Sequence, residues 1–245
     1  MSEFTTSYDE QLTKEVLHYN RFPQMLPFIG SQWGKHKKLL LIGESHYIDG
    51  KMLSKELPDC DYQKEWYELD EKKFSRDLCW NIHTRGVVKK ADLPNEQGYS
   101  KALSIFYNVK KEIKGTIPVF SNEPTVFQYF SFMNYFQRPA FIKGDSIKNN
   151  QKDNQIAYHT LKGVLNVVTP DAIVFTSSKA YNAFWWSRKQ DGEISIFNNI
   201  KVTHVPHPGC AWWGRESKRH GKTHDGKNRT GRQKFVAILK EVFEP

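Results

Sequence analysis

The sequence predicts an α/β protein of three layers, α/β/α, in which helices cover both faces of a central four-stranded parallel sheet. Two observations lead to this fold class. Short continuous apolar runs, typical of strands buried on both faces, alternate with segments of helical periodicity. Polar clusters follow the apolar runs directly. Strand, helix and strand in alternation is the arrangement of a parallel sheet, whose connections cross its faces.

The first predicted strand is Lys38–Ile42, and its apolar run ends at Gly43. The side chains that follow it are those of Glu44, Ser45, His46 and Tyr47. In open α/β sheets, ligands bind beyond the carboxyl ends of the strands. The chain therefore brings a carboxylate, a hydroxyl, an imidazole and a phenol to the place where chemistry is usually done.

The remaining elements extend this pattern. Three further strands are predicted from β-prone or continuous apolar runs, at Thr125–Met133, Asp171–Thr176 and Ile200–Pro206. Helical spacing of apolar residues predicts helices over Asp9–Asn20, Asp61–Trp80, Ser100–Lys114, Asp153–Val168, Lys179–Ser187 and Gly231–Phe243. The polar residues that follow the three later strands are Asn134, Ser177, Ser178 and His207–Gly209. Polar groups after all four strands predict one site at one sheet edge.

Length and composition describe a single domain. The 245 residues suit one domain over 1–245, with a helical insertion at about 48–124. Three cysteines, Cys60, Cys79 and Cys210, make no disulfide framework. The polar N-terminus is unlike a signal peptide, and no apolar run approaches the roughly 18 residues of a membrane helix. We expect a cytoplasmic monomer that makes no use of the membrane.

The charge predicts an anionic partner, most often nucleic acid, since the formal net charge is +9. Residues 215–234 hold eight Lys and Arg against two acids, and predict a solvated, mobile loop suited to phosphate contacts. The candidate phosphate contacts are Arg215, Lys218, Arg219 and Lys222. Trp212 and Trp213 precede this segment and suit wedging into base stacks. The alternative is that at least one of them is buried.

Two further residues suit chemistry on a nucleobase. Asn134 has an amide that donates and accepts, as the edge of a base requires, although it could also cap the strand end. His207 is flanked by prolines, which stiffen its backbone, and a neutral imidazole can donate to a departing group. It could also be a surface turn residue. A zinc site is a further alternative, with ligands from His204, His207, Cys210, His220 and His224.

In order and spacing, these motifs resemble those of the uracil-DNA glycosylase superfamily. Gly43–Tyr47 resembles the family's motif after the first strand, and Asn134 resembles the base-reading residue that closes the second. His207–Gly209 resembles the His-Pro motif, and Ala211–Trp213 resembles the DNA-penetrating loop. The resemblance covers roughly residues 38–47 and 125–245 and implies the family's three-layer α/β/α fold.

The resemblance also implies a function. The chain would be a glycosylase-like hydrolase of DNA or another nucleic acid, as in DNA repair, which flips a base out and cleaves its N-glycosidic bond. His207 would donate to the departing base, and Glu44, with Ser45 or His46, would position water. The implied base-binding residues are Gly43, Tyr47 and Asn134. No metal or other cofactor is expected.

Two alternatives stay open. Ser45 stands where many family members carry a catalytic Asp or Asn, so the chain could be a non-catalytic member that binds nucleic acid or a nucleotide. The segment Ile42–Ser45 also resembles the Gly-Asp-Ser-Leu start of lipase-like ester hydrolases, with Ser45 as nucleophile. In those enzymes an Asp lies three residues before the catalytic His, and here His204 occupies that position before His207.

Overall fold

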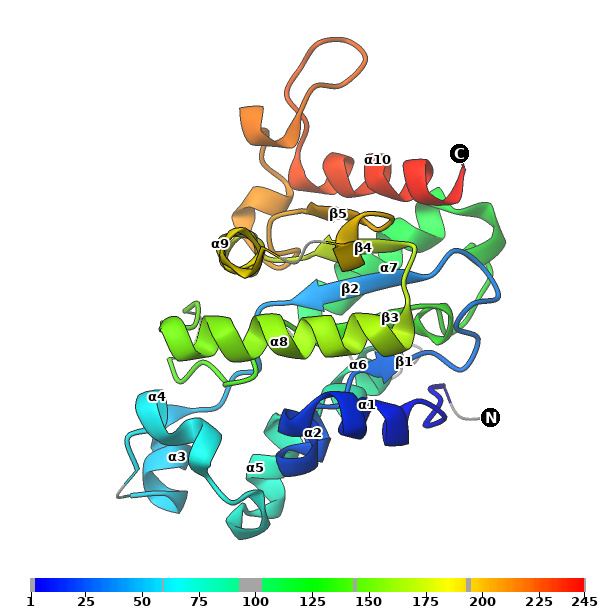
Figure 1. The fold of residues 1–245 in the computed structure, drawn as a ribbon. Helices are drawn as coiled ribbons and strands as arrows, with labels where there is room; N and C mark the ends of the chain where they lie inside the picture. Colours follow the sequence, from blue (N-terminus) through cyan, green and yellow to red (C-terminus); the bar gives the residue numbers. More distant parts are fainter. Residues whose placement is uncertain (1–2, 59, 93–102, 143–144, 193–194, 245) are drawn as a thin grey trace.

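A mixed five-stranded sheet forms the centre of the protein (Figure 1). The computed structural model describes residues 3–58, 60–92, 103–142, 145–192 and 195–244. The strands are β1 (Phe28–Ile29), β2 (Leu39–Gly43), β3 (Ser131–Asn134), β4 (Ala172–Phe175) and β5 (Lys201–His204). Their order is β1-β3-β2-β4-β5. The strand β1 runs antiparallel to β3, and all other neighbours are parallel.

The predicted α/β class is confirmed, and the first predicted strand is β2, in the middle of the sheet. The predicted sheet of four parallel strands was incomplete, because β1 adds an antiparallel fifth strand at the edge. With only two residues, β1 is too short to show any periodicity in the sequence.

Helices cover both faces of the sheet, and the side chains of β2 alternate between them. Leu40 and Ile42 join the core under α1 (Asp9–Glu15), α8 (Gln151–Val168) and α9 (Ser178–Asp191). Leu39 and Leu41 join the core under α6 (Thr84–Asp92), α7 (Ser104–Thr116) and α10 (Gly231–Phe243). In Figure 1, α8 crosses in front of the sheet and α7 lies behind it. Burial on both faces explains the unbroken apolar run of β2.

The other helices are short. They are α2 (Leu17–Arg21), α3 (Gly50–Glu56), α4 (Tyr62–Glu65) and α5 (Arg76–Asn81). The 3-10 turns are η1 (Pro23–Met25), η2 (Trp66–Glu68), η3 (Glu71–Lys73), η5 (Pro118–Phe120), η6 (Phe127–Tyr129), η7 (Ser195–Phe197), η8 (Ala211–Trp213) and η9 (Lys218–His220). Among the described residues no helix is long and apolar enough to cross a membrane.

Local capping explains where predicted helices were broken. The predicted helix over Asp61–Trp80 is divided into α4, η2, η3 and α5. Asp61, Asp70 and Ser75 each accept a hydrogen bond from a backbone N–H two or three residues ahead, so each starts a new turn. The predicted helix over Asp9–Asn20 breaks at Val16, which is extended. Of the predicted helix Ser100–Lys114, residues 100–102 lie outside the described residues.

The second predicted strand, Thr125–Met133, becomes a strand only at Ser131. The buried Asp92 carboxylate accepts hydrogen bonds from the backbone N–H groups of Val126 (3.1 Å) and Phe127 (2.8 Å). These bonds fix the chain in the turn η6 before the strand begins. A long-range contact from α6 therefore overrides the local β preference.

Candidate functional site

The parallel strands place the predicted site residues at one edge of the sheet, since β2, β3, β4 and β5 share a direction. Gly43 and Asn134 are register partners at the ends of β2 and β3. A Cβ atom at position 43 would lie 2.4 Å from Oδ1 of Asn134. Glycine at position 43 therefore leaves the space that the Asn134 amide occupies at the sheet edge.

Glu44 is half-buried and held by two hydrogen bonds. Its Oε1 accepts from the backbone N–H of Ile147 at 3.1 Å, and its Oε2 accepts from the hydroxyl of Ser177 at 2.7 Å. Ser177 also caps the N-terminus of α9. Each carboxylate oxygen retains a second acceptor site. The carboxylate is thus fixed in position and can still accept a hydrogen bond from a ligand or water.

His207 lies on the loop after β5, and α7 fixes this loop. The Nδ2 amide of Asn108 donates to the carbonyl of Pro208 at 2.8 Å. Ser104 packs closely on Gly209, since a Cβ atom on residue 209 would lie 2.6 Å from Oγ of Ser104. The N–H of Gly209 donates to Nδ1 of His207 at 3.0 Å. Because a backbone N–H can only donate, Nδ1 is the acceptor, and a neutral His207 carries its proton on Nε2.

The electrostatics of His207 link it to Glu44. The imidazole reaches the surface, but surrounding protein atoms desolvate it and lower its pKa below the ordinary value of 6.5. The nearby Glu44 carboxylate opposes that shift by stabilising the imidazolium ion. Net lowering keeps the ring neutral at pH 7. The result is a neutral ring with an Nε2–H donor and a carboxylate nearby.

The three residues after Glu44 point into different surroundings. Ser45 is half-buried. His46 is buried, and its Nε2 lies 3.0 Å from Oγ1 of Thr84 in α6. Burial, with a smaller contribution from His83, lowers the pKa of His46 to about 3. Tyr47 is 37% exposed and forms a backbone bridge with Ala140. Successive side chains point in different directions, so His46 faces α6 of the helical insertion while Tyr47 faces solvent.

Two predicted roles need correction. His46 is not open to solvent beside Glu44, because its side chain is buried and its Nε2 lies against Thr84 in the interior. Trp213 belongs to the core, where its ring centroid lies 5.8 Å from that of Phe235. Trp212 is 54% exposed, with the Arg215 guanidinium 6.0 Å from its ring centroid. Of these two tryptophans, Trp212 is the exposed one.

Residues 215–230, here called the basic hairpin, extend away from the sheet in Figure 1. The predicted loop is in fact paired: Glu216 bridges Thr230, Lys222 bridges Asn228, and η9 lies between them. The cations predicted to contact phosphates are all exposed and form no ion pair among the described residues; they are Arg215, Lys218, Arg219 and Lys222. Four unpaired cations on one projection make an anion-attracting surface.

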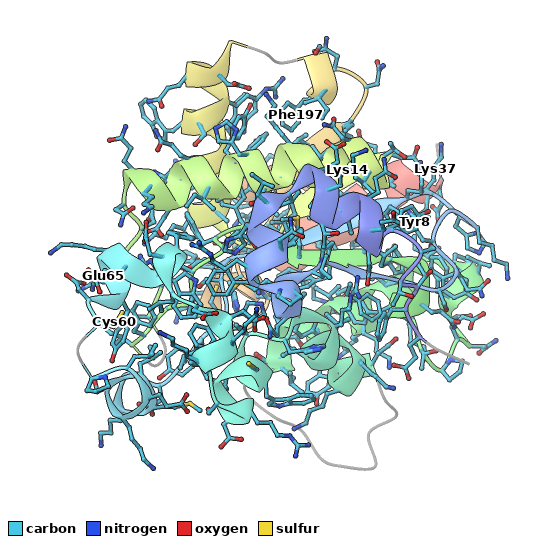
Figure 2. The ribbon with its side chains drawn as sticks, turned by 60° about the horizontal axis from the view of Figure 1, so that its bottom comes forward. Tyr8, Lys14, Lys37, Cys60, Glu65 and Phe197 are labelled. Carbon is cyan, nitrogen blue, oxygen red and sulfur yellow. The ribbon has the colours of Figure 1, made fainter. Side chains whose placement is uncertain are left out.

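The zinc arrangement does not assemble. In the described part of the chain, no group of three or more His, Cys, Asp and Glu side chains could hold a metal ion. The three cysteines are free thiols. Cys60 and Glu65 lie together in the helical insertion (Figure 2), where desolvation and the glutamate raise the pKa of Cys60 to about 11. Its thiol is therefore protonated at neutral pH and a poor nucleophile.

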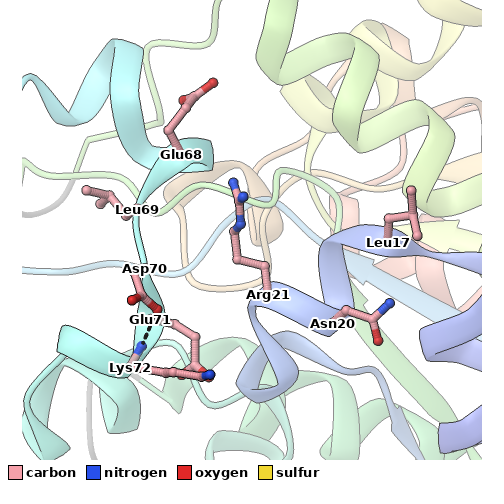
Figure 3. Close-up of a pocket in the computed structure, with 8 residues that line it drawn as sticks. All are labelled: Leu17, Asn20, Arg21, Glu68, Leu69, Asp70, Glu71 and Lys72. Carbon is pink, nitrogen blue, oxygen red and sulfur yellow. Dashed lines mark hydrogen bonds between the residues drawn. The ribbon is translucent and has the colours of Figure 1, made fainter.

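A surface hollow of about 430 Å³ lies apart from this edge, between α2 and the turns η2 and η3 (Figure 3). It is lined by Leu17, Asn20, Arg21, Glu68, Leu69, Asp70, Glu71 and Lys72. Arg21 donates to the carbonyl of Tyr67, and Asp70 accepts from the N–H of Lys72 at 3.1 Å. Its charged groups thus serve local structure, and no predicted site residue lines it.

Three site residues had little or no signal in the sequence. Ser177 was visible only as a polar residue after a strand, and its bond to Glu44 depends on the pairing of β2 with β4. Asn108 and Ser104 reach the His207 loop from α7, and Asn108 lies 100 residues before Pro208 in the chain. No family model matches the sequence, and no match was found among curated proteins.

Proposed function

We propose that the protein is a glycosylase-like hydrolase that cleaves the N-glycosidic bond of a base flipped out of nucleic acid. The observation that carries the proposal is the state of His207. Gly209 holds its Nδ1 as an acceptor, and desolvation keeps the ring neutral, so Nε2–H is a fixed donor. A fixed donor is what a departing base with developing negative charge requires.

The neighbouring groups suit the other steps. Asn134 reads the base edge, because its amide offers a donor and an acceptor at the strand end. Glu44 positions the attacking water, since its held carboxylate keeps acceptor sites free. Ser45, half-buried beside it, supplies a second water contact. The bond from C1′ of the sugar to the base nitrogen breaks, water adds its oxygen to C1′, and its proton ends on solvent or the departing base.

The polymer is the inferred substrate because the exposed surface near this edge is basic. Trp212 and the four unpaired cations of the basic hairpin follow the His207 loop directly in the chain. Phosphate contacts give affinity without sequence preference, while an exposed aromatic ring stacks on unpaired bases. Tyr47, partly exposed after Gly43, limits the size of the base.

The non-catalytic alternative is favoured by one observation. The two protein hydrogen bonds to Glu44, from Ile147 and Ser177, also suit a carboxylate with a purely structural function. The ester-hydrolase alternative has less support, because His207 Nδ1 is occupied by Gly209 and no Asp precedes it by three residues.

Base release decides between these functions. The substrates are oligonucleotides that contain uracil, hypoxanthine or alkylated bases. His207→Ala should lower turnover about 100- to 1000-fold, as expected for loss of one donor to a developing anion, while binding persists. Ser45→Ala should lower turnover less than His207→Ala does. If wild-type protein binds these oligonucleotides but releases no base from any of them, the non-catalytic function is correct. If Ser45→Ala is the more damaging change, Ser45 is the nucleophile.

A further inference from the structure

The surface of α9 carries an aromatic and cationic strip that the proposed site does not use. The strip consists of exposed Trp186 and Lys189 together with half-buried Tyr181, Trp185 and Arg188, and Tyr181 and Trp185 also pack against the core. The opposite side of α9 is buried in the core through Ala180, Ala183 and Phe184. Trp186 is 67% exposed, one of the most exposed large apolar side chains described. An exposed tryptophan on an ordered helix marks an interaction surface when it belongs to a patch of related groups.

Rings and cations are paired along the strip. Nζ of Lys189 lies 5.4 Å from the ring centroid of Trp186, and the Arg188 guanidinium lies 4.9 Å from that of Trp185. Arg188 is also 5.1 Å from the ring of Phe197, the labelled residue beside α9 in Figure 2. The cations are thus held beside the rings instead of extending freely into solvent.

The charge of α9 selects the class of partner. Its sequence, Ser178–Asp191, contains three cations and a single acid, Asp191. Asp191 is already engaged, since Tyr158 (3.0 Å) and Lys162 (2.8 Å) both donate to its Oδ2. Within α9 itself, the strip therefore offers positive charge and aromatic rings, and the one carboxylate of the helix is already hydrogen-bonded. That combination is typical of surfaces for single-stranded nucleic acid.

The strip begins at the candidate site. Tyr181 stacks on His204 with ring centroids 4.1 Å apart and an angle of 21° between the planes. His204 is the last residue of β5, three positions before His207. Tyr181 then meets Trp185 edge to face at 6.0 Å. At the N-terminus of α9, Ser177 donates to Glu44. Tyr181 and Trp185 thus connect the candidate site to exposed Trp186, the ring that a strand leaving the site along α9 could stack on.

We propose that the α9 strip binds a single-stranded segment of the nucleic acid next to the flipped base, with a base stacked on Trp186 and phosphates beside Arg188 and Lys189. This inference rests on the proposed function for its polymer, but it makes a separate statement about binding. A continuous duplex presents no free base face to Trp186, so the strip should favour unpaired strands over duplex.

Binding of a fluorescein-labelled oligodeoxythymidylate to the full chain tests the inference by anisotropy. Trp186→Ala should weaken binding about 5- to 150-fold, the range for loss of one base-stacking ring. Trp186→Phe should restore most of the affinity. The matched control is Trp80→Ala, since Trp80 is also exposed, at 53%, but lies on α5 outside the strip.

The inference is overturned if Trp186→Ala binds as wild type, or if Trp80→Ala weakens binding equally. Base release by wild-type protein is measured separately, so the two proposals can fail independently. Loss of affinity in Trp186→Ala, with no base release by wild-type protein, would support binding by the strip and contradict the glycosylase function. Base release by wild-type protein together with unchanged affinity in Trp186→Ala would support the glycosylase function and contradict binding by the strip.

Discussion

The backbone N–H of Gly209 donates to Nδ1 of His207 at 3.0 Å, which places the proton of a neutral His207 on Nε2. The geometry of this bond depends on close packing. A Cβ atom on residue 209 would lie 2.6 Å from Oγ of Ser104 and 3.0 Å from Cε1 of His207. Contacts that short require the loop or the imidazole to move.

Gly209→Ala should therefore release His207 from its fixed tautomer and reduce base release about 100-fold, as small displacements of a reacting group can. Imidazole ¹⁵N chemical shifts report the tautomer directly, whatever the activity. Gly214→Ala is the matched control, because no atom lies within 4 Å of its Cβ position and its φ is −98°. Equal ¹⁵N spectra for wild type and Gly209→Ala would contradict this account of the loop.

The influence of Glu44 on His207 predicts a shift in pH dependence. Desolvation lowers the pKa of His207 and the Glu44 carboxylate raises it, so Glu44→Gln should lower that pKa further. Protonation of Nδ1 displaces the Gly209 N–H and releases the fixed ring, so turnover should fall as pH drops through the pKa of His207. In Glu44→Gln the acid limb of the remaining activity should move to lower pH. An NMR titration of His207 measures the shift directly, and exposed Glu216→Gln should leave it unchanged.

The basic hairpin predicts salt-sensitive binding. Each phosphate neutralised on duplex DNA steepens the slope of log K against log salt by about 0.9. Replacing Arg215, Lys218, Arg219 and Lys222 with Ala should flatten the slope by up to about 3.6. The control removes four exposed lysines of the helical insertion, Lys51, Lys55, Lys72 and Lys73. If both variants have the same slope, the hairpin has no special contact with phosphates.

Buried His46 predicts a loss of stability in acid. Its pKa is about 3 in the folded protein, against 6.5 when exposed, so the unfolded chain binds one more proton between these values. Stability therefore falls as pH drops below 6.5. This one residue contributes about 1.4 kcal/mol of the fall per pH unit within that window.

His46→Gln keeps a hydrogen-bonding group near Thr84 and removes the titration. Between pH 6.5 and 5, urea unfolding should show about 2 kcal/mol less loss of stability than in wild type. Comparing each variant with itself at two pH values cancels any packing defect. Exposed His224→Gln serves as the control. An unchanged fall in His46→Gln would mean that the histidine titrates normally in the folded protein.

The sequence by itself determined the parallel part of the sheet and, apart from α6, the approximate positions of the helices that cover it. Burial on both faces produces the uninterrupted apolar run of β2, and the helix over Gly231–Phe243 agrees with the structure at both ends. In the structure, Thr230 and Gln233 form a capping box that starts this helix within four residues of chain. Placement of Glu44, Asn134 and His207 on segments at one edge follows from strand direction alone.

Only the tertiary structure decided which of those residues face one another and what each contacts. His46 and Trp213 look like site residues in the sequence but belong to the interior, through Thr84 and Phe235. Ser177, Asn108 and Ser104 act on the site from other elements. Local sequence records periodicity and capping, which act over a few residues. The direction of a side chain beyond a strand end depends on partners distant in the chain.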